Sequence, residues 1–301
     1  MQRIVQPLPP FNSAPTAGTS PVLTVPHRGR SFSYIALRVR GSGPSSAVLD
    51  VRNVVTSVEV LINDKPVSTY LPKLWAQYAA YLNQNGDTPA VDMLLIPFES
   101  PGVRGSELGT ADIETLQLRV NVVAALPSST TFTGIDASAC YFLENVPRAE
   151  AFVHRIITPK MTAAGENVFS NLDFGSIVKL RRLFLMCLPA TADLAVTGAL
   201  NANTAITRAR IKVGDLPVWD AKSEDVNFLL NQSPLYKIPG TQYGHFIPLD
   251  LNLNSDDFQV IKLGDTRLPF ELVVEWDSGV TATQLLIVAE GTEGVRIVPK
   301  A

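Results

Sequence analysis

The side chains that most often carry out catalysis are few in this sequence, and they are not arranged as a catalytic site. Its three histidines, His27, His154 and His245, have no partner at the spacing of a metal site or a catalytic triad. Cys187 is the one nucleophile that could pair with His245, although no nucleophile elbow surrounds either residue. The sequence also lacks a GxGxxG motif, a P-loop and an HExxH motif. We therefore predict that the protein is not an enzyme.

A run of oxygen-bearing side chains is the one candidate metal site. These residues are Asp250, Asn252, Asn254 and Asp256. Their spacing resembles the start of a calcium loop, but the central glycine is absent and Ile261 stands where a bidentate glutamate would close the site. A solvated strand end is the alternative, because Leu251 and Leu253 alternate as strand residues do. No cofactor is predicted except calcium, bound here or at a site shared between subunits.

Basic residues are most dense in a short stretch after residue 27. They are Arg28, Arg30, Arg38 and Arg40, and Lys179, Arg181 and Arg182 hold the equivalent place in the second half of the chain. Such charges can protect strand edges from pairing with other sheets. They can also contact an anionic partner such as a surface of lipid headgroups. The net charge of -3 does not favour a specific nucleic-acid partner.

The two halves of the sequence repeat each other. Residues 58–67 read like residues 209–218. One constant offset relates Thr56 to Thr207, Asp64 to Asp215, Pro66 to Pro217, Val67 to Val218, and Pro97 to Pro248. A repeat of this length exceeds the roughly 20 to 50 residues of a solenoid unit, so it indicates two copies of a whole domain.

Each half is predicted to be rich in strands. Ile35, Leu37 and Val39 alternate with polar neighbours, as in a half-buried strand. One helix interrupts each half, over residues 72–82 and 223–230. Many short strands with proline and glycine turns indicate an all-β fold of two sandwiches or barrels.

Residues 1–26 are predicted to form an extended N-terminal arm. They hold six of the 22 prolines, among serine, threonine, glycine and alanine, and such a composition packs poorly. The predicted domains are residues 27–146 and 147–301. Removal of the arm is therefore expected to leave both domains folded and to weaken attachment to neighbours or lipid.

Composition is consistent with two globular domains. A length of 301 residues suits two domains, and 46% hydrophobic with only 18% charged residues indicates a large buried or interfacial area. No apolar run approaches the roughly 18 residues of a membrane span, and the proline-rich start does not resemble a secretory signal. Cys140 and Cys187 are expected to be buried strand residues without a disulfide or zinc.

The proline-rich start, the two strand-rich halves and residues 58–70 together resemble the major capsid proteins of PM2-like, membrane-containing bacteriophages. In residues 58–70 a strand is followed by a turn with Asp64 and then by Ser68-Thr69-Tyr70, which leads into the predicted helix. Residues 29–41 are similar to the family's first strand, and residues 206–230 to its second-barrel counterpart.

This resemblance implies a double jelly roll, with two tandem eight-stranded barrels and one short helix in each. It implies that three chains form a pseudo-hexagonal capsomer of an icosahedral virion over an internal lipid membrane. The partners would be further copies of the chain, penton or other minor capsid and membrane proteins, and the membrane itself through the arm or the basic residues. Assembly would take place in the cytoplasm of a bacterial host.

A tandem jelly-roll protein that binds carbohydrate with the help of calcium is the alternative, since jelly rolls also form lectins. Aromatic residues grouped on one set of loops would favour it. Trp75, Trp219 and Trp276 are instead dispersed along the chain.

Overall fold

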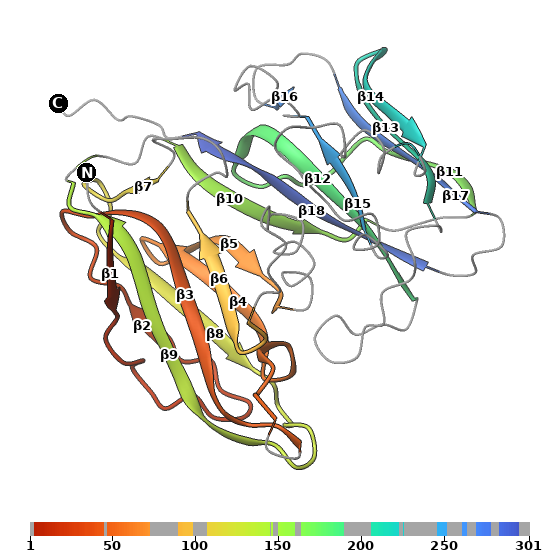
Figure 1. Cartoon of the computed structure of the whole chain (residues 1–301). Helices are drawn as coiled ribbons and strands as arrows, with labels where there is room; N and C mark the ends of the chain where they lie inside the picture. The colour runs from red at the N-terminus through yellow and green to blue at the C-terminus, as the bar shows by residue number, and fades with distance from the viewer. Residues whose placement is uncertain are drawn as a thin grey trace. The chain divides into compact units, whose positions relative to one another are not determined.

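In the computed structural model, the chain forms two compact units (Figure 1). Unit 1 comprises residues 1–80, 87–153 and 294–301, and unit 2 comprises residues 81–86 and 154–293. The structure describes residues 3–44, 47–72, 90–98, 107–144, 146, 150–159, 164–189, 206–222, 225, 246–251, 261–263, 269–277 and 283–294. The contacts given below lie among these residues.

Unit 1 is built from two antiparallel sheets. The first has the strand order β1-β9-β3-β6, with β7 also paired to β3, and the second has the order β2-β8-β4-β5. The strands are β1 (Ile4–Pro7), β2 (Val22–Thr24), β3 (Ser31–Ser42), β4 (Val55–Ile62), β5 (Lys65–Tyr70), β6 (Met93–Pro97), β7 (Leu108–Gly109), β8 (Leu116–Val122) and β9 (Thr131–Phe142). A 3₁₀ turn, η2 (Val51–Asn53), precedes β4. The chain crosses repeatedly between the two sheets, in the strand order of a jelly roll.

Unit 2 repeats this arrangement strand for strand. Its sheets have the orders β10-β18-β12-β15, with β16 also paired to β12, and β11-β17-β13-β14. The strands are β10 (Glu150–Ile157), β11 (Gly165–Phe169), β12 (Ile177–Pro189), β13 (Ile206–Val213), β14 (Leu216–Lys222), β15 (Phe246–Asp250), β16 (Ile261–Lys262), β17 (Phe270–Trp276) and β18 (Thr283–Gly294). Each strand of unit 1 therefore has its counterpart nine places later, and the fold is an all-β double jelly roll.

The repeated sequence motif forms a hairpin at the corresponding place in both units. In unit 1, Asn63 and Asp64 join β4 to β5 with φ angles of 51° and 62°. Positive φ at both central residues is what a tight hairpin turn requires. In unit 2, Gly214 has a φ of 62° in the turn between β13 and β14, which it shares with Asp215. Asp64 and Asp215 thus lie in corresponding turns, as the repeat predicted.

The two units also have β-bulges at corresponding positions. Thr56 is the extra residue where β4 pairs with β8, and its hydroxyl donates to the carbonyl oxygen of Asn121 at 3.1 Å. Thr207 is the extra residue where β13 pairs with β17, and its hydroxyl donates to the carbonyl oxygen of Glu275 at 3.3 Å. The extra residues of the next strand pairs are Val67 and Val218. The repeat in sequence is therefore a repeat of local backbone irregularities.

The pairing register of the two units corresponds less closely in the other sheet of each unit, β1-β9-β3-β6 and β10-β18-β12-β15. Pro97 on β6 pairs with Tyr34, and Pro248 on β15 pairs with Phe184, so the two prolines occupy corresponding strands. Measured from the nearest bulge in β3 and in β12, the pair that contains Pro248 lies two residues further along its strand than the pair that contains Pro97. A shift of two residues keeps every side chain on its original face.

The core of each unit lies between its two sheets. On β8, Leu116, Leu118, Val120 and Val122 are buried while the residues between them are half-buried. In unit 2, Leu272 and Val274 on β17 and Leu183 on β12 are fully buried. On β8 the period of two thus marks the face that the strand turns inward, whereas on β17 the intervening Val273 is fully buried as well.

The prediction of an N-terminal arm over residues 1–26 is wrong. β1 pairs with β9, and β2 pairs with β8, so this segment supplies one strand to each sheet of unit 1. Leu23 and Val25 are fully buried in the core. Pro7 is the last residue of β1, and the other prolines lie next to β2 or in the connection between the two strands, where a missing N–H removes no pairing from the sheet.

Other predicted boundaries fall near or outside the described residues. The helices expected over residues 72–82 and 223–230 lie outside them, apart from single helical positions at Pro72 and Asp225. The chain passes from unit 1 to unit 2 within β10, between Val153 and His154, a few residues after the predicted boundary between residues 146 and 147.

Replacement of Gly41 by alanine is expected to lower the free energy of unfolding by about 3 kcal/mol. Gly41 has a φ of 139°, and a Cβ there would lie 1.9 Å from the carbonyl oxygen of Thr131, so the backbone must move. Gly43→Ala is the matched control, because its Cβ would have no neighbour nearer than 3.6 Å. Urea unfolding followed by circular dichroism compares the two, and equal stabilities would contradict this prediction.

Candidate functional site

The four arginines predicted as one basic cluster fall into two separate pairs. Arg28 and Arg30 precede β3, whereas Arg38 and Arg40 lie towards its other end. The eight residue-to-residue steps from Arg30 to Arg38 span about 26 Å of extended strand. The structure therefore brings together two arginines at each end of β3 and does not bring the four together.

The first pair stands beside the loop that follows β7. Arg30 donates a hydrogen bond to the carbonyl oxygen of Pro26 at 2.8 Å, and its guanidinium carbon lies 4.5 Å from the ring centre of Tyr141. Arg28 is exposed and has no ion pair with another described residue. It borders a hollow that Asp112 and Glu114 also line. Arg28 is thus the arginine of the four that is both exposed and without an ion pair to a described residue.

The second pair is neutralised by one acid that directly precedes β6 and one that lies on β9. The Nε of Arg38 lies 2.9 Å from Oδ2 of Asp92, and the Nε of Arg40 lies 2.5 Å from Oδ2 of Asp136. Exposed pairs of this kind contribute about 0 to 1 kcal/mol to stability. Their larger effect is to cancel the positive charge on this face, so an anionic partner would have to compete with both carboxylates.

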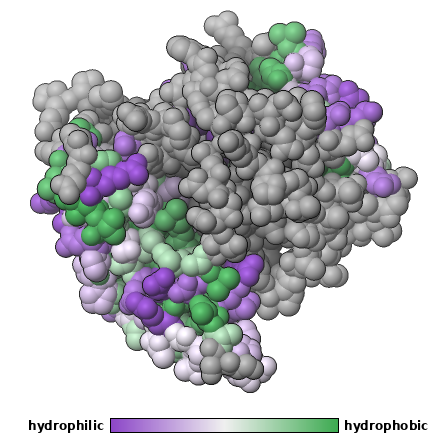
Figure 2. All heavy atoms as spheres, in the orientation of Figure 1, coloured by the Kyte–Doolittle hydropathy of each residue, from purple (hydrophilic) through white to green (hydrophobic). Residues whose placement is uncertain are grey.

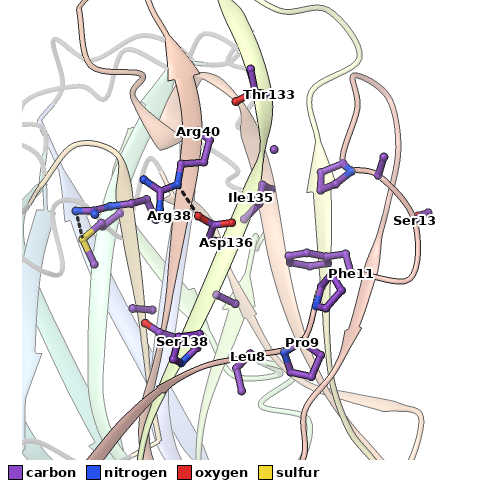
Figure 3. Close-up of a pocket in the computed structure, with 18 residues that line it drawn as sticks. Leu8, Pro9, Phe11, Ser13, Arg38, Arg40, Thr133, Ile135, Asp136 and Ser138 are labelled. Atoms are coloured by element: carbon purple, nitrogen blue, oxygen red, sulfur yellow. Dashed lines mark hydrogen bonds and ion pairs between the residues drawn. The ribbon is translucent and has the colours of Figure 1, made fainter.

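A hollow of about 790 Å³, here called the β9 groove, opens between this second pair and the chain that follows β1 (Figure 3). Its lining is Pro7, Leu8, Pro9, Pro10, Phe11, Ser13, Ala14, Pro15, Ala36, Arg38, Arg40, Met93, Thr133, Gly134, Ile135, Asp136, Ala137 and Ser138. In Figure 3, Pro9 and Phe11 face the hollow from one side, and Ile135 and Asp136 lie across it. The groove therefore has a mostly apolar lining with two internally paired arginines at its rim.

The second half of the chain carries a buried ionic row instead of a basic face. Arg182 on β12 is almost fully buried, and its guanidinium donates to Asp250 on β15 and to Glu290 on β18, each at 2.7 Å. The Nε2 of His154 on β10 lies 3.6 Å from Oε2 of Glu290. These four side chains come from the four main strands of one sheet.

This row bears on the predicted calcium site. Asp250 is fully buried, and one of its carboxylate oxygens already accepts the hydrogen bond from Arg182. A cation at Asp250 would have to share the carboxylate with that guanidinium. Asn252, Asn254 and Asp256 lie outside the described residues. Among the residues that the structure does describe, no group of three or more potential metal ligands occurs.

The histidines do not form a catalytic site within the described part of the chain. The ring nitrogens of His27 lie 3.1 Å from the carbonyl oxygen of Val25 and 3.0 Å from that of Ile113, which ties the start of β3 to the loop before β8. His154 belongs to the ionic row. His245 and the side chain of Cys187 lie outside the described residues, and Cys140 is a buried free cysteine.

The outer face of the sheet β11-β17-β13-β14 is covered by ion pairs. Arg208 donates two hydrogen bonds to Asp220, and these bonds lower the pKa of the Asp220 carboxyl. Arg210 pairs with Glu166 and approaches Glu275. In Figure 2, hydrophobic and hydrophilic residues are interspersed over the described part of the visible face. No helix among the described residues is long and apolar enough to span a membrane.

Sequence reasoning missed the acids that complete these arrangements. Asp92, Asp136 and Glu290 lie far along the chain from the arginines that they pair with. Strand alternation places each on a given face, but only the register of the paired strands brings it beside its partner. The register of the paired strands is therefore the signal that would have identified these three acids.

Comparison with known proteins gives matches in structure. No protein-family model and no curated protein sequence matches the chain. The major capsid protein P2 of bacteriophage PM2 has a TM-score of 0.69 at 17% identity, with 97% of each chain covered. A chain of the PBCV-1 virus capsid has a TM-score of 0.68 at 10% identity, covering 97% of this chain and 93% of that one. A chain of Sulfolobus Turreted Icosahedral Virus has a TM-score of 0.70 at 10% identity, covering 98% and 92%.

These likenesses confirm the fold that the resemblance to PM2-like capsid proteins implied. The match extends over both jelly rolls, since nearly the whole of each chain is covered. The similar structures are described as virus or capsid structures and not as enzymes.

Proposed function

We propose that the protein is a major capsid protein whose homotrimers form the pseudo-hexagonal capsomers of an icosahedral virion. The observation that carries this proposal is the strand-for-strand equivalence of the two jelly rolls in one chain. Three such chains present six similar units around one axis, and closed symmetry is the usual solution for repeated self-contacts. The capsid structures that share the fold over nearly their whole length support the same function.

The composition fits a chain that is largely covered by neighbours. Only 18% of its residues are charged, and the described charges that face outward on β3 and β13 are mostly paired within the chain. We expect each interface between chains to bury about 2,000 Å² or more, as obligate assemblies do.

Further partners belong to this proposal. A shell over an internal membrane would need a contact with lipid headgroups, and Arg28 is the best placed of the four arginines because it is exposed and has no ion pair with a described residue. Penton and other minor capsid proteins would occupy the remaining contacts of the shell. The proposed location is the virion, after assembly in the cytoplasm of a bacterial host.

Light scattering coupled to size-exclusion chromatography tests the proposed assembly. The expected mass is three times the chain mass of 32.6 kDa, at micromolar concentration and after gentle dissociation of larger particles. A stable monomer would count against the capsid function. Specific, calcium-dependent glycan binding by that monomer would favour the carbohydrate-binding alternative.

A further inference from the structure

Four edge strands of the two jelly rolls contain a proline, which opposes pairing with another strand. β5, β6, β14 and β15 each lie at a sheet edge and each contain a proline. These are Pro66, Pro97, Pro217 and Pro248. Proline removes a donor from the edge, which is a common way of preventing edge-to-edge association. β9 contains no proline, and part of its length is also an edge.

β1 covers only the second half of β9. Its four residues pair with residues 138–141, and the N–H of Leu8 donates to the carbonyl oxygen of Ala137 at 2.9 Å. Pro9 and Pro10 follow, and because neither has an N–H, the pairing ends there. Residues 131–136 of β9 have β3 on one side and no strand among the described residues on the other.

The backbone of Ile135 points to that uncovered side. Ile135 lies opposite Val39 in the ladder between β9 and β3, and the N–H of Val39 donates to Asp92 on the far side of β3 at 2.9 Å. In an antiparallel pair, opposed residues either bond to each other or both point away. The N–H and C=O of Ile135 therefore point away from β3, and neither has a backbone partner there among the described residues.

This open edge faces the β9 groove. Ile135 and its neighbours Thr133, Gly134 and Asp136 line one side of the hollow, whose volume of about 790 Å³ lies within the usual range of binding pockets. The rim carries no net charge, since Arg38 and Arg40 are paired with acids. The groove thus suits an uncharged, extended segment and does not suit an anionic chain.

We propose that an extended segment from a second copy of the chain adds a strand to β9 along residues 133–136. The added strand would bond to the N–H and C=O of Ile135 and continue the line of β1 beyond the point where Pro9 turns away. A second copy is the occupant because the rim is neutral and because the proposed shell places further copies around every chain. This inference rests on the proposed function and specifies one of its contacts.

Lysine substitution at Thr133 tests the contact. Thr133 is exposed and lines the groove, whereas Thr131 is exposed on the same strand and does not line it, so Thr131→Lys is the matched control. A charged side chain in the path of the added strand should oppose pairing. Sedimentation velocity over a range of concentrations should show self-association of Thr133→Lys weakened about tenfold or more, with the control unchanged.

Hydrogen exchange of the unsubstituted protein provides a second measurement. The amide of Ile135 is expected to exchange rapidly in the dissociated chain and to become protected on assembly, because its N–H gains a partner. The amide of Ala36 on β3, which lies in the paired ladder, serves as a reference that is protected in both states.

One result would contradict only the strand-addition contact, and another would contradict the proposed capsid function as well. If the unsubstituted protein assembles, but both lysine variants assemble equally well and the Ile135 amide stays unprotected, the strand-addition contact is wrong and the capsid function stands. If the unsubstituted protein does not assemble at all, both fail.

Discussion

Deletion of residues 1–26 is expected to unfold unit 1. The deletion removes a strand from each sheet together with the fully buried side chains of Leu23 and Val25. Burying two such side chains contributes about 3 to 6 kcal/mol, which is a large part of the stability of a typical domain. Hydrogen exchange read by mass spectrometry should show lost protection in β4 and β8 of unit 1.

Strands β13 and β17 of unit 2 serve as the internal control for this deletion, because β1 and β2 supply no strand to their sheet. Leu23→Ala is a milder version that should lower the free energy of unfolding by about 2 to 5 kcal/mol. Thr24→Ala is its matched control, since Thr24 is exposed between the two buried residues. Full protection of β8 after the deletion would show that residues 1–26 are peripheral after all.

Replacement of Arg182 by methionine is expected to lower the free energy of unfolding by about 3 to 5 kcal/mol. The substitution removes the guanidinium that bonds to the buried carboxylates of Asp250 and Glu290. Removing one partner from a buried ionic group leaves charge in a poorly solvated site, which is far more destabilising than loss of a surface pair.

Arg208→Met is the matched control for that substitution. Arg208 pairs with Asp220 on an exposed sheet face, where loss of the pair should lower stability far less than loss of the buried guanidinium of Arg182. Urea unfolding of both variants at neutral pH gives the comparison. Similar losses for the two variants would mean that the row of Arg182, Asp250 and Glu290 is solvated and not a buried element of unit 2.

The local parts of the fold could be predicted because they depend on few neighbouring residues. Asn63-Asp64 and Gly214-Asp215 favour positive φ, and a hairpin turn follows from that preference alone. Thr56 and Thr207 kept their offset in the sequence because both occupy a bulge that the fold repeats. Duplication of the domain was therefore visible before any pairing of strands was known.

The N-terminal strands could not be predicted in the same way. β1 and β2 have four and three residues, too few to establish a period of two, and prolines lie at the end of β1 and just before β2. Both strands are defined by their partners, β9 and β8, which come more than 90 residues later in the sequence. Long-range pairing of this kind leaves almost no local signal.

The arginines of the candidate site stand out in the sequence, but their surroundings do not. The sequence shows Arg38 and Arg40 two residues apart, and thus on one face of a strand. It does not show that Asp92, which directly precedes β6, and Asp136, which lies on β9, pair with these two arginines. Similarly, Asp250 looked like a solvated strand end, whereas Arg182 pairs with it in the buried face of a sheet.

Electron microscopy of the purified protein tests the capsid function most directly. Three copies of a duplicated jelly roll predict flat particles with three-fold symmetry and a pseudo-hexagonal outline of six similar lobes. Single-chain particles without this symmetry, at concentrations where a capsid protein would be assembled, would contradict it.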